Sequence, residues 1–124
     1  MRLAALSSPL LVLSTCPDTE TAGRIARALI EERLAACVNR VPGIASTYRW
    51  RGEILDDAEI LLLIKTTRER FEALRARLVE LHPYDIPEVI ALDIARGHTP
   101  YLDWLAGETA PRPDAGKRGG HLRQ

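Results

Sequence analysis

The densest group of potential metal ligands lies on a short segment flanked by prolines. His82, Asp85 and Glu88 are spaced three residues apart, and Pro83 and Pro87 stiffen the backbone that presents them. An imidazole with carboxylates suits copper, zinc or nickel. The favoured alternative is structural: His82 ends the preceding helix, Asp85 starts a turn and Glu88 pairs with an arginine across a subunit boundary. A metal site formed by these three residues remains the other interpretation.

Two cysteines offer thiol chemistry in different surroundings. Cys16 lies where a strand gives way to a helix, and helix amides there lower a thiol pKa, so it is a candidate metal ligand or reactive thiol. An inert role is an equal alternative. Cys37 follows two alanines and is expected to pack inertly in the core. Two cysteines are too few for a disulfide framework, so a reducing, cytoplasmic compartment is expected.

Lys65 is the candidate for holding a small anion. It stands at the end of an apolar strand and before a helix, where a cation and helix amides can act together. An ion pair with Glu88, or with a carboxylate of a neighbouring subunit, is an equal alternative. The chain has no glycine-rich phosphate loop, so a nucleotide would need another cradle.

The acidic residues of the central segment do not form a catalytic pair. Asp56 and Asp57 are adjacent on a predicted strand and point to opposite faces. Asp57 and Glu59 share a face, where Arg49 or Arg51 is expected opposite them as a cross-strand partner. A small enzyme built on His82, Glu88 and Lys65 is a further alternative, but no general acid–base pair and no nucleophile–base spacing supports it. We expect no enzymatic activity and no required cofactor.

Composition excludes two further classes of partner. The 124 residues carry 17 basic and 17 acidic side chains, so no bulk positive field awaits nucleic acid. The longest aliphatic run, residues 60–64, is far below the roughly 20 residues that cross a bilayer. We expect neither a nucleic-acid partner nor a membrane partner.

Hydrophobic periodicity predicts the order βαββαβ. An apolar strand over residues 10–15 leads to a helix with Asp18 as its N-cap. Residues 36–50 and 53–66 form a hairpin joined at Arg51-Gly52, with a bend or bulge at Pro42-Gly43. Each arm of about 13 residues would extend some 40 Å, beyond what one small core covers.

The second half of the chain supplies the remaining elements. Thr66 and Glu69 form a capping-box pattern before a helix that ends at His82-Pro83. A strand follows over residues 89–94. Thr99 as N-cap and Gly107 just past the end frame a short last helix. Residues 1–9 are expected to be an N-terminal extension and residues 107–124 a flexible basic tail, on either side of one domain over residues 10–106.

Six short motifs within the predicted domain are more specific than the element order. They are Ser14-Thr15-x-Pro17-Asp18, Leu34-Ala35-Ala36-Cys37-Val38, Tyr48-x-Trp50-x-Gly52-x-Ile54, Ile64-Lys65-Thr66-Thr67, His82-Pro83-Tyr84-x-x-Pro87-Glu88 and Tyr101-Leu102-x-Trp104. Together they resemble the CutA family of divalent-cation tolerance proteins. The resemblance implies a ferredoxin-like α+β subunit with a long β-hairpin and a short C-terminal helix, assembled as a homotrimer similar to the PII-type signalling trimers.

The resemblance also implies where function resides. Clefts between subunits would take a metal ion or a small anion, with Lys65, Tyr84, Asp85 and Glu59 as candidate lining residues. Subunit contacts would involve Tyr48, Trp50 and Trp104. The metal candidates are His82, Cys16 and Glu88. Some family members carry a copper set whose other positions here are Ser14 and Leu81, so any copper or zinc would bind weakly. A non-enzymatic trimeric binding or signalling protein is expected, and an interaction scaffold without a small ligand is the alternative.

Overall fold

Strand β1 (Pro9–Cys16) alternates buried and half-buried side chains along its whole length, as a central strand with one face on a core does. The computed structural model describes residues 8–111. β1 pairs with β3 (Glu53–Thr67) and β4 (Ile90–Asp93), and β2 (Cys37–Trp50) completes the order β2-β3-β1-β4. Every neighbouring pair is antiparallel, which confirms the predicted ferredoxin-like arrangement.

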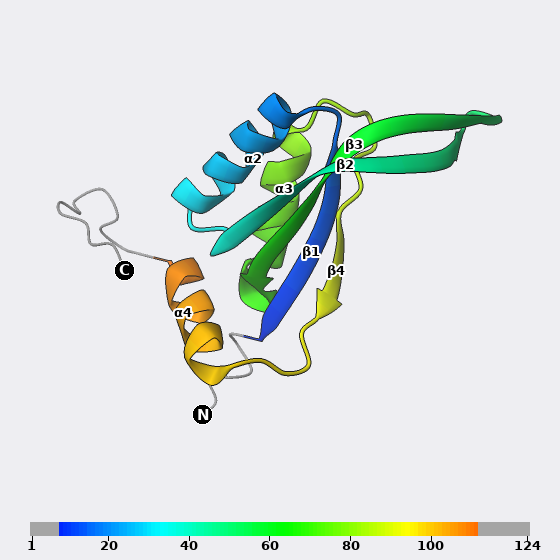
Figure 1. The fold of residues 1–124 in the computed structure, drawn as a ribbon. Helices are drawn as coiled ribbons and strands as arrows, with labels where there is room; N and C mark the ends of the chain where they lie inside the picture. Colours follow the sequence, from blue (N-terminus) through cyan, green and yellow to red (C-terminus); the bar gives the residue numbers. More distant parts are fainter. Residues whose placement is uncertain (1–7, 112–124) are drawn as a thin grey trace.

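Helices α2 (Thr19–Glu31) and α3 (Phe71–Leu81) lie side by side on one face of the sheet (Figure 1). α2 begins as predicted, because the Asp18 carboxylate accepts the Thr21 amide at 2.8 Å. Between these helices and the sheet lies the apolar core. Its fully buried members include Val12, Ile25, Leu29, Leu62, Ile64, Leu74 and Leu78.

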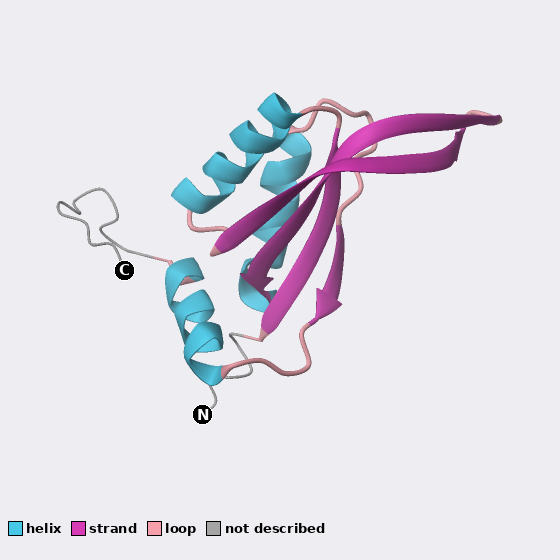
Figure 2. Ribbon diagram, in the orientation of Figure 1, coloured by secondary structure: helices cyan, strands magenta, loops and turns pink. Residues whose placement is uncertain are grey.

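The other face of the sheet is only partly covered. α4 (Thr99–Thr109) packs beside β3 and β1, and its Leu105 is fully buried (Figure 2). Elsewhere on this face the alternation of β1 presents half-buried leucines, and β4 leaves Ile90 and Leu92 about half exposed. We call this the open face. No described helix is long and apolar enough to cross a membrane.

The predicted long hairpin is confirmed. β2 has 14 residues and β3 has 15, and none of their residues over 44–50 and 53–58 is buried. Arg51 and Gly52 both adopt positive φ angles, of 51° and 84°, as a tight hairpin turn requires. The hairpin therefore projects as a two-stranded ribbon well beyond the body (Figure 1).

A bulge at Pro42-Gly43 interrupts the ribbon as predicted. Val41 pairs with Leu61, yet the next pair joins Ile44 to Glu59, so β2 has one residue more than β3 here. Gly43 supplies the left-handed conformation, with a φ of 78°. Before the bulge, odd-numbered β2 residues share a face with Glu59 and Leu61; after it, even-numbered residues do.

Two predicted helix starts are wrong. Thr66 caps no helix: it is buried in β3, and its hydroxyl donates to the Leu34 carbonyl at 2.7 Å. A 3-10 turn, η1 (Arg68–Arg70), precedes α3 instead, without a side-chain cap. Thr99 is the first residue of α4 and not its N-cap, which is His98.

The end of α4 also differs from the prediction. Gly107 lies inside the helix, which continues to Thr109 because Arg33 supplies the terminating contacts. The Arg33 guanidinium donates to the carbonyls of Gly107 at 2.8 Å and Ala110 at 3.0 Å. The first residues of the predicted tail are therefore helical, while its basic residues lie outside the described part of the chain.

Candidate functional site

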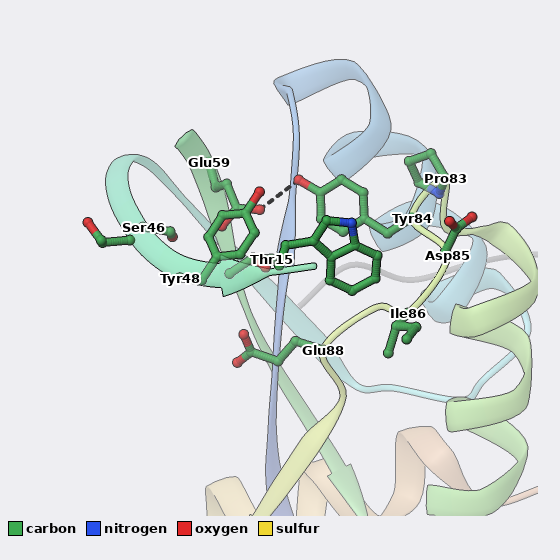
Figure 3. Close-up of a pocket in the computed structure, with 11 residues that line it drawn as sticks. Thr15, Ser46, Tyr48, Glu59, Pro83, Tyr84, Asp85, Ile86 and Glu88 are labelled. Carbon is green, nitrogen blue, oxygen red and sulfur yellow. Dashed lines mark hydrogen bonds between the residues drawn. The ribbon is translucent and has the colours of Figure 1, made fainter. Parts of the chain in front are cut away.

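A cavity of about 670 Å³ lies between the ribbon and the loop that follows α3. β1, β2 and β3 supply one wall, and residues 83–88 supply the other (Figure 3). Beyond the bulge, the even-numbered β2 residues are the ones that lie on the side of Glu59. The lining residues are Thr15, Ser46, Thr47, Tyr48, Trp50, Glu59, Pro83, Tyr84, Asp85, Ile86 and Glu88. We call this space the acidic aromatic cavity.

Glu59 is the most deeply placed charge of the cavity. Only 7% of the residue is exposed, although it carries a carboxylate. The Tyr84 hydroxyl donates to Glu59 Oε2 at 2.6 Å, the contact drawn in Figure 3. Within residues 8–111 this is the one hydrogen bond that the Glu59 carboxylate makes, and no Lys, Arg or His pairs with it. Most of its acceptor capacity is therefore unused.

Both phenols of the cavity stay protonated. Burial, together with the hydrogen bond to Glu59, raises the pKa of Tyr84 far above its ordinary value. The hydrogen bond to Asp57, together with partial burial, raises the pKa of Tyr48. Each tyrosine therefore acts as a neutral hydrogen-bond donor to a carboxylate oxygen.

The charge of the lining has a single sign. Asp85 and Glu88 are exposed on the loop, and Glu59 is buried across from them. No lysine or arginine is among the residues that line the cavity. One cation contacts a lining side chain: the Arg51 guanidinium lies 5.3 Å from the ring centroid of Trp50. The site is thus suited to a positively charged occupant.

His82 fastens the loop to the sheet. Its Nε2 lies 2.7 Å from the Thr15 carbonyl, and its Nδ1 accepts the Tyr84 amide at 3.1 Å. This pattern fits a neutral ring with its proton on Nε2. The imidazole also packs on the Tyr84 ring, with centroids 4.6 Å apart. His82 therefore positions Tyr84, and a metal would have to displace a hydrogen bond to reach either nitrogen.

The predicted metal candidates are not assembled in the fold. Cys16 is fully buried among the core residues, whereas Glu88 is exposed on the rim of the cavity. Across residues 8–111 no group of three His, Cys, Asp or Glu side chains is placed to hold a metal ion. The expectation of a lowered thiol pKa is wrong, because burial, and secondarily Asp18, raises the pKa of Cys16 to about 11.

Three other sequence expectations differ from the structure. Lys65 neither lines the cavity nor pairs with Glu88: its ammonium donates to Asn39 on β2. Among the described residues Asp57 and Glu59 have no arginine partner, because the register that runs from the hairpin turn sets Ser46 and Ile44 opposite them and Arg49 opposite Ile54. Cys37 is half-buried outside the core cluster, beside Tyr101.

Sequence reasoning did name part of the cavity and missed the rest. The structure brings Glu59, Tyr84, Asp85 and Glu88 to one space, from positions up to 29 residues apart. Asp57 as the partner of Tyr48 was missed, as were Thr15, Ser46 and Ile86, whose residue types carry no chemical signal.

The residues predicted at subunit contacts have separate locations. Trp50 and Tyr48 line the cavity from the ribbon. Trp104 lies on α4, stacked on Tyr101 with centroids 5.4 Å apart, and is 38% exposed. Their role in subunit contacts stays a prediction.

Comparison with known proteins gives a consistent result. Residues 10–108 match the family model described as CutA1 divalent ion tolerance protein. The chain is 57% identical over 99 residues to the divalent-cation tolerance protein CutA of Thermus thermophilus, covering 80% of this chain and 96% of that one. It is 46% identical to human protein CutA over 101 residues, covering 82% of this chain but only 56% of the longer human protein. The crystal structure of CutA from Xylella fastidiosa superposes with a TM-score of 0.82 at 48% identity, covering 84% of this chain and all of that one.

Proposed function

The chain belongs to the CutA1 family of divalent ion tolerance proteins, and from that membership we propose that it is a non-enzymatic binding or signalling protein. Its ligand site is the acidic aromatic cavity. The observation that carries this proposal is the cavity itself: about 670 Å³, within the size range of small-molecule sites, walled by aromatic rings and carboxylates.

The surroundings of the reactive side chains support a non-enzymatic role. Both nitrogens of His82 are engaged with backbone groups. Lys65 is bound to Asn39, and the Cys16 thiol is buried and protonated. A catalytic nucleophile needs a base within hydrogen-bond reach. None of these three groups has such a partner in the described chain.

The protein is proposed to act as a homotrimer. The exposed outer half of the ribbon and the apolar open face are surfaces that a single subunit leaves without a core. An isolated two-stranded ribbon is marginal in water, so association with neighbouring subunits would stabilise it. We place the assembly in the cytoplasm, in keeping with its two free cysteines.

A divalent metal is proposed as a weak ligand and not as a required cofactor. Copper or zinc would bind at His82 only by competing with the Thr15 carbonyl or the Tyr84 amide. Cys16 would bind a metal as a thiolate, which its raised pKa disfavours. A tight site needs three or four ligands, and the described part of one chain does not bring that many together.

Native mass spectrometry of protein purified without chelators or affinity metals tests this proposal. The expected result is a trimer that retains a small bound mass, displaced on partial denaturation. A monomer at micromolar concentration would refute the assembly. A ligand-free trimer that also binds none of a library of small cations and anions would refute the binding role.

The alternative is a trimeric interaction scaffold without a small ligand. The apolar side chain that favours it is Ile54, 64% exposed near the end of the ribbon. Exposed apolar side chains at a projecting tip suit contact with another protein. The scaffold would be supported by a trimer that carries no bound mass and loses a protein partner when Ile54 is changed to Asp.

A further inference from the structure

The chemistry of the lining residues limits the class of ligand that the acidic aromatic cavity can bind. Three carboxylates face it, from Glu59, Asp85 and Glu88, and no basic side chain lines it. An anion would be repelled from such a space. The small-anion ligand expected from Lys65 therefore does not fit here, since Lys65 lies elsewhere and is engaged by Asn39.

Glu59 provides the second, independent indication of a cation. It is 93% buried, faces the cavity and receives one hydrogen bond, from the neutral hydroxyl of Tyr84. A buried carboxylate normally has a cationic partner or several donors, because taking a charge out of water is costly. Within the described chain Glu59 has neither. A ligand that brings N–H donors and positive charge would supply both.

The aromatic walls distinguish an organic cation from a metal ion. Tyr48, Trp50 and Tyr84 present ring surface that a bare divalent cation does not use, and the cavity is far larger than one ion. No group of three His, Cys, Asp or Glu residues in the described chain is placed to chelate a metal. The indole of Trp50 already attracts one cation, the Arg51 guanidinium at 5.3 Å.

We propose, building on the binding role assigned above, that the acidic aromatic cavity binds a linear aliphatic polyamine. One primary ammonium donates to the free acceptor positions of Glu59. The methylene chain lies along the rings of Trp50 and Tyr84, which bury it from water. A second ammonium reaches the exposed carboxylates of Asp85 and Glu88 at the rim. The separation between Glu59 and the rim carboxylates thus suits a ligand whose ammonium groups are separated by a methylene chain.

Calorimetric titration of the intact protein with spermidine tests the proposal. At 150 mM salt, binding is expected, and Glu59→Gln should weaken it at least tenfold because a buried charge-assisted hydrogen bond is lost. Asp103→Asn is the matched control: it removes one carboxylate from an exposed position on α4 and should leave binding unchanged. Circular dichroism and thermal unfolding establish that each variant is folded.

Further variants and probes make the outcome decisive. If Glu59→Gln does not fold, the rim variant Asp85→Asn with Glu88→Gln should weaken spermidine more than it weakens tetramethylammonium, which carries a single charge and no N–H. Mg²⁺ at equal ionic strength should bind more weakly than spermidine. Equal spermidine affinity in wild type and variants, or Mg²⁺ binding that depends on Glu59 as strongly, would overturn the polyamine assignment.

The failure of this inference differs from a failure of the proposed function. A protein that ignores spermidine but retains another bound mass in native mass spectrometry keeps its binding role and loses only the ligand class. A protein that retains no mass and binds no probe loses both.

Discussion

At the level of single residues, His82 links the cavity to the sheet. One ring nitrogen reaches the Thr15 carbonyl and the other takes the Tyr84 amide, so the imidazole fixes the loop on which Tyr84 stands. Tyr84 in turn donates to Glu59. His82, which the sequence predicts as a metal ligand, therefore has a structural role. It affects ligand binding by fixing the position of Tyr84.

The thiol of Cys16 should be nearly unreactive in the folded protein. Its pKa of about 11 exceeds the ordinary value of 9.0, so at pH 8 the thiolate is about a hundredfold scarcer than in an exposed cysteine. In a Cys37→Ser variant, where Cys16 is the single thiol, alkylation by iodoacetamide should be slower by at least that factor than in the unfolded chain. Equal rates would contradict the burial.

The same pKa shift sets a direction for stability against pH. The folded state holds the thiol proton more tightly than the unfolded state, so the contribution of Cys16 is complete below pH 9 and is lost as the pH rises towards 11. Cys16→Ala should flatten this alkaline decline in urea titrations. An unchanged decline would assign it to other groups.

Two buried hydroxyls of the sheet should respond to removal with opposite signs. Ser14 is fully buried and its Oγ has no hydrogen-bond partner among residues 8–111, so Ser14→Ala should raise the free energy of unfolding by about 1 kcal/mol. Thr66 is equally buried but donates to the Leu34 carbonyl, so Thr66→Val should lower it by about the same amount. Urea denaturation measures both, and losses in both variants would argue against an unpaired Ser14.

At the level of elements, Arg33 joins the end of α2 to the end of α4. It follows the C-cap residue Glu32 with a φ of 58°, a left-handed conformation that costs a non-glycine residue about 1 kcal/mol. Its guanidinium nevertheless holds two carbonyls at the end of α4. The conformational cost and the capping contacts therefore oppose each other at one residue.

Two substitutions at Arg33 separate these effects. Arg33→Ala loses the contacts and keeps the strained backbone, so it should lower the free energy of unfolding by about 1 kcal/mol. Arg33→Gly loses the same contacts but relieves the strain, so its stability should stay close to that of the wild type. Urea denaturation distinguishes the two, and equal losses would show that the backbone is unstrained.

The elements were predictable wherever a local pattern determines them. The hairpin turn at Arg51-Gly52 and the N-cap at Asp18 depend on a few adjacent residues, and both are confirmed. Thr66 matches a capping-box pattern in the local sequence, yet its hydroxyl donates a hydrogen bond to the carbonyl of Leu34, 32 residues away. The partnership of Tyr84 with Glu59 likewise spans 25 residues. Such contacts arise from the packing of distant segments and leave no spacing signal.

At the level of the whole molecule, the two faces of the sheet differ in completeness. The face under α2 and α3 encloses the core, whereas the open face retains apolar side chains in partial contact with water. A single subunit thus covers the apolar side chains on one face of its sheet only. For this reason we expect assembly through the open face and the ribbon.

Matched lysine substitutions on the two faces test this expectation. Leu92 on β4 is 48% exposed and Val79 on α3 is 39% exposed, so each alone tolerates a charge about equally well. By light scattering, wild type and Val79→Lys should be trimers, while Leu92→Lys should shift towards monomer because a lysine would be desolvated at the interface. A trimeric Leu92→Lys protein would locate the interface elsewhere.

The extra residue of the bulge has a consequence at the level of the gene. In an antiparallel ribbon a shift of one position turns every side chain over. Loss of one codon at Pro42 or Gly43 would cause no such shift: one residue would remain opposite Ile60, the bulge would disappear, and the pairs from Ile44 to Trp50, set by the turn, would keep their register. One in-frame deletion here would therefore shorten the protein without moving Tyr48 or Trp50 from the cavity wall, so the gene can lose a codon at the one place where the two paired strands differ in length.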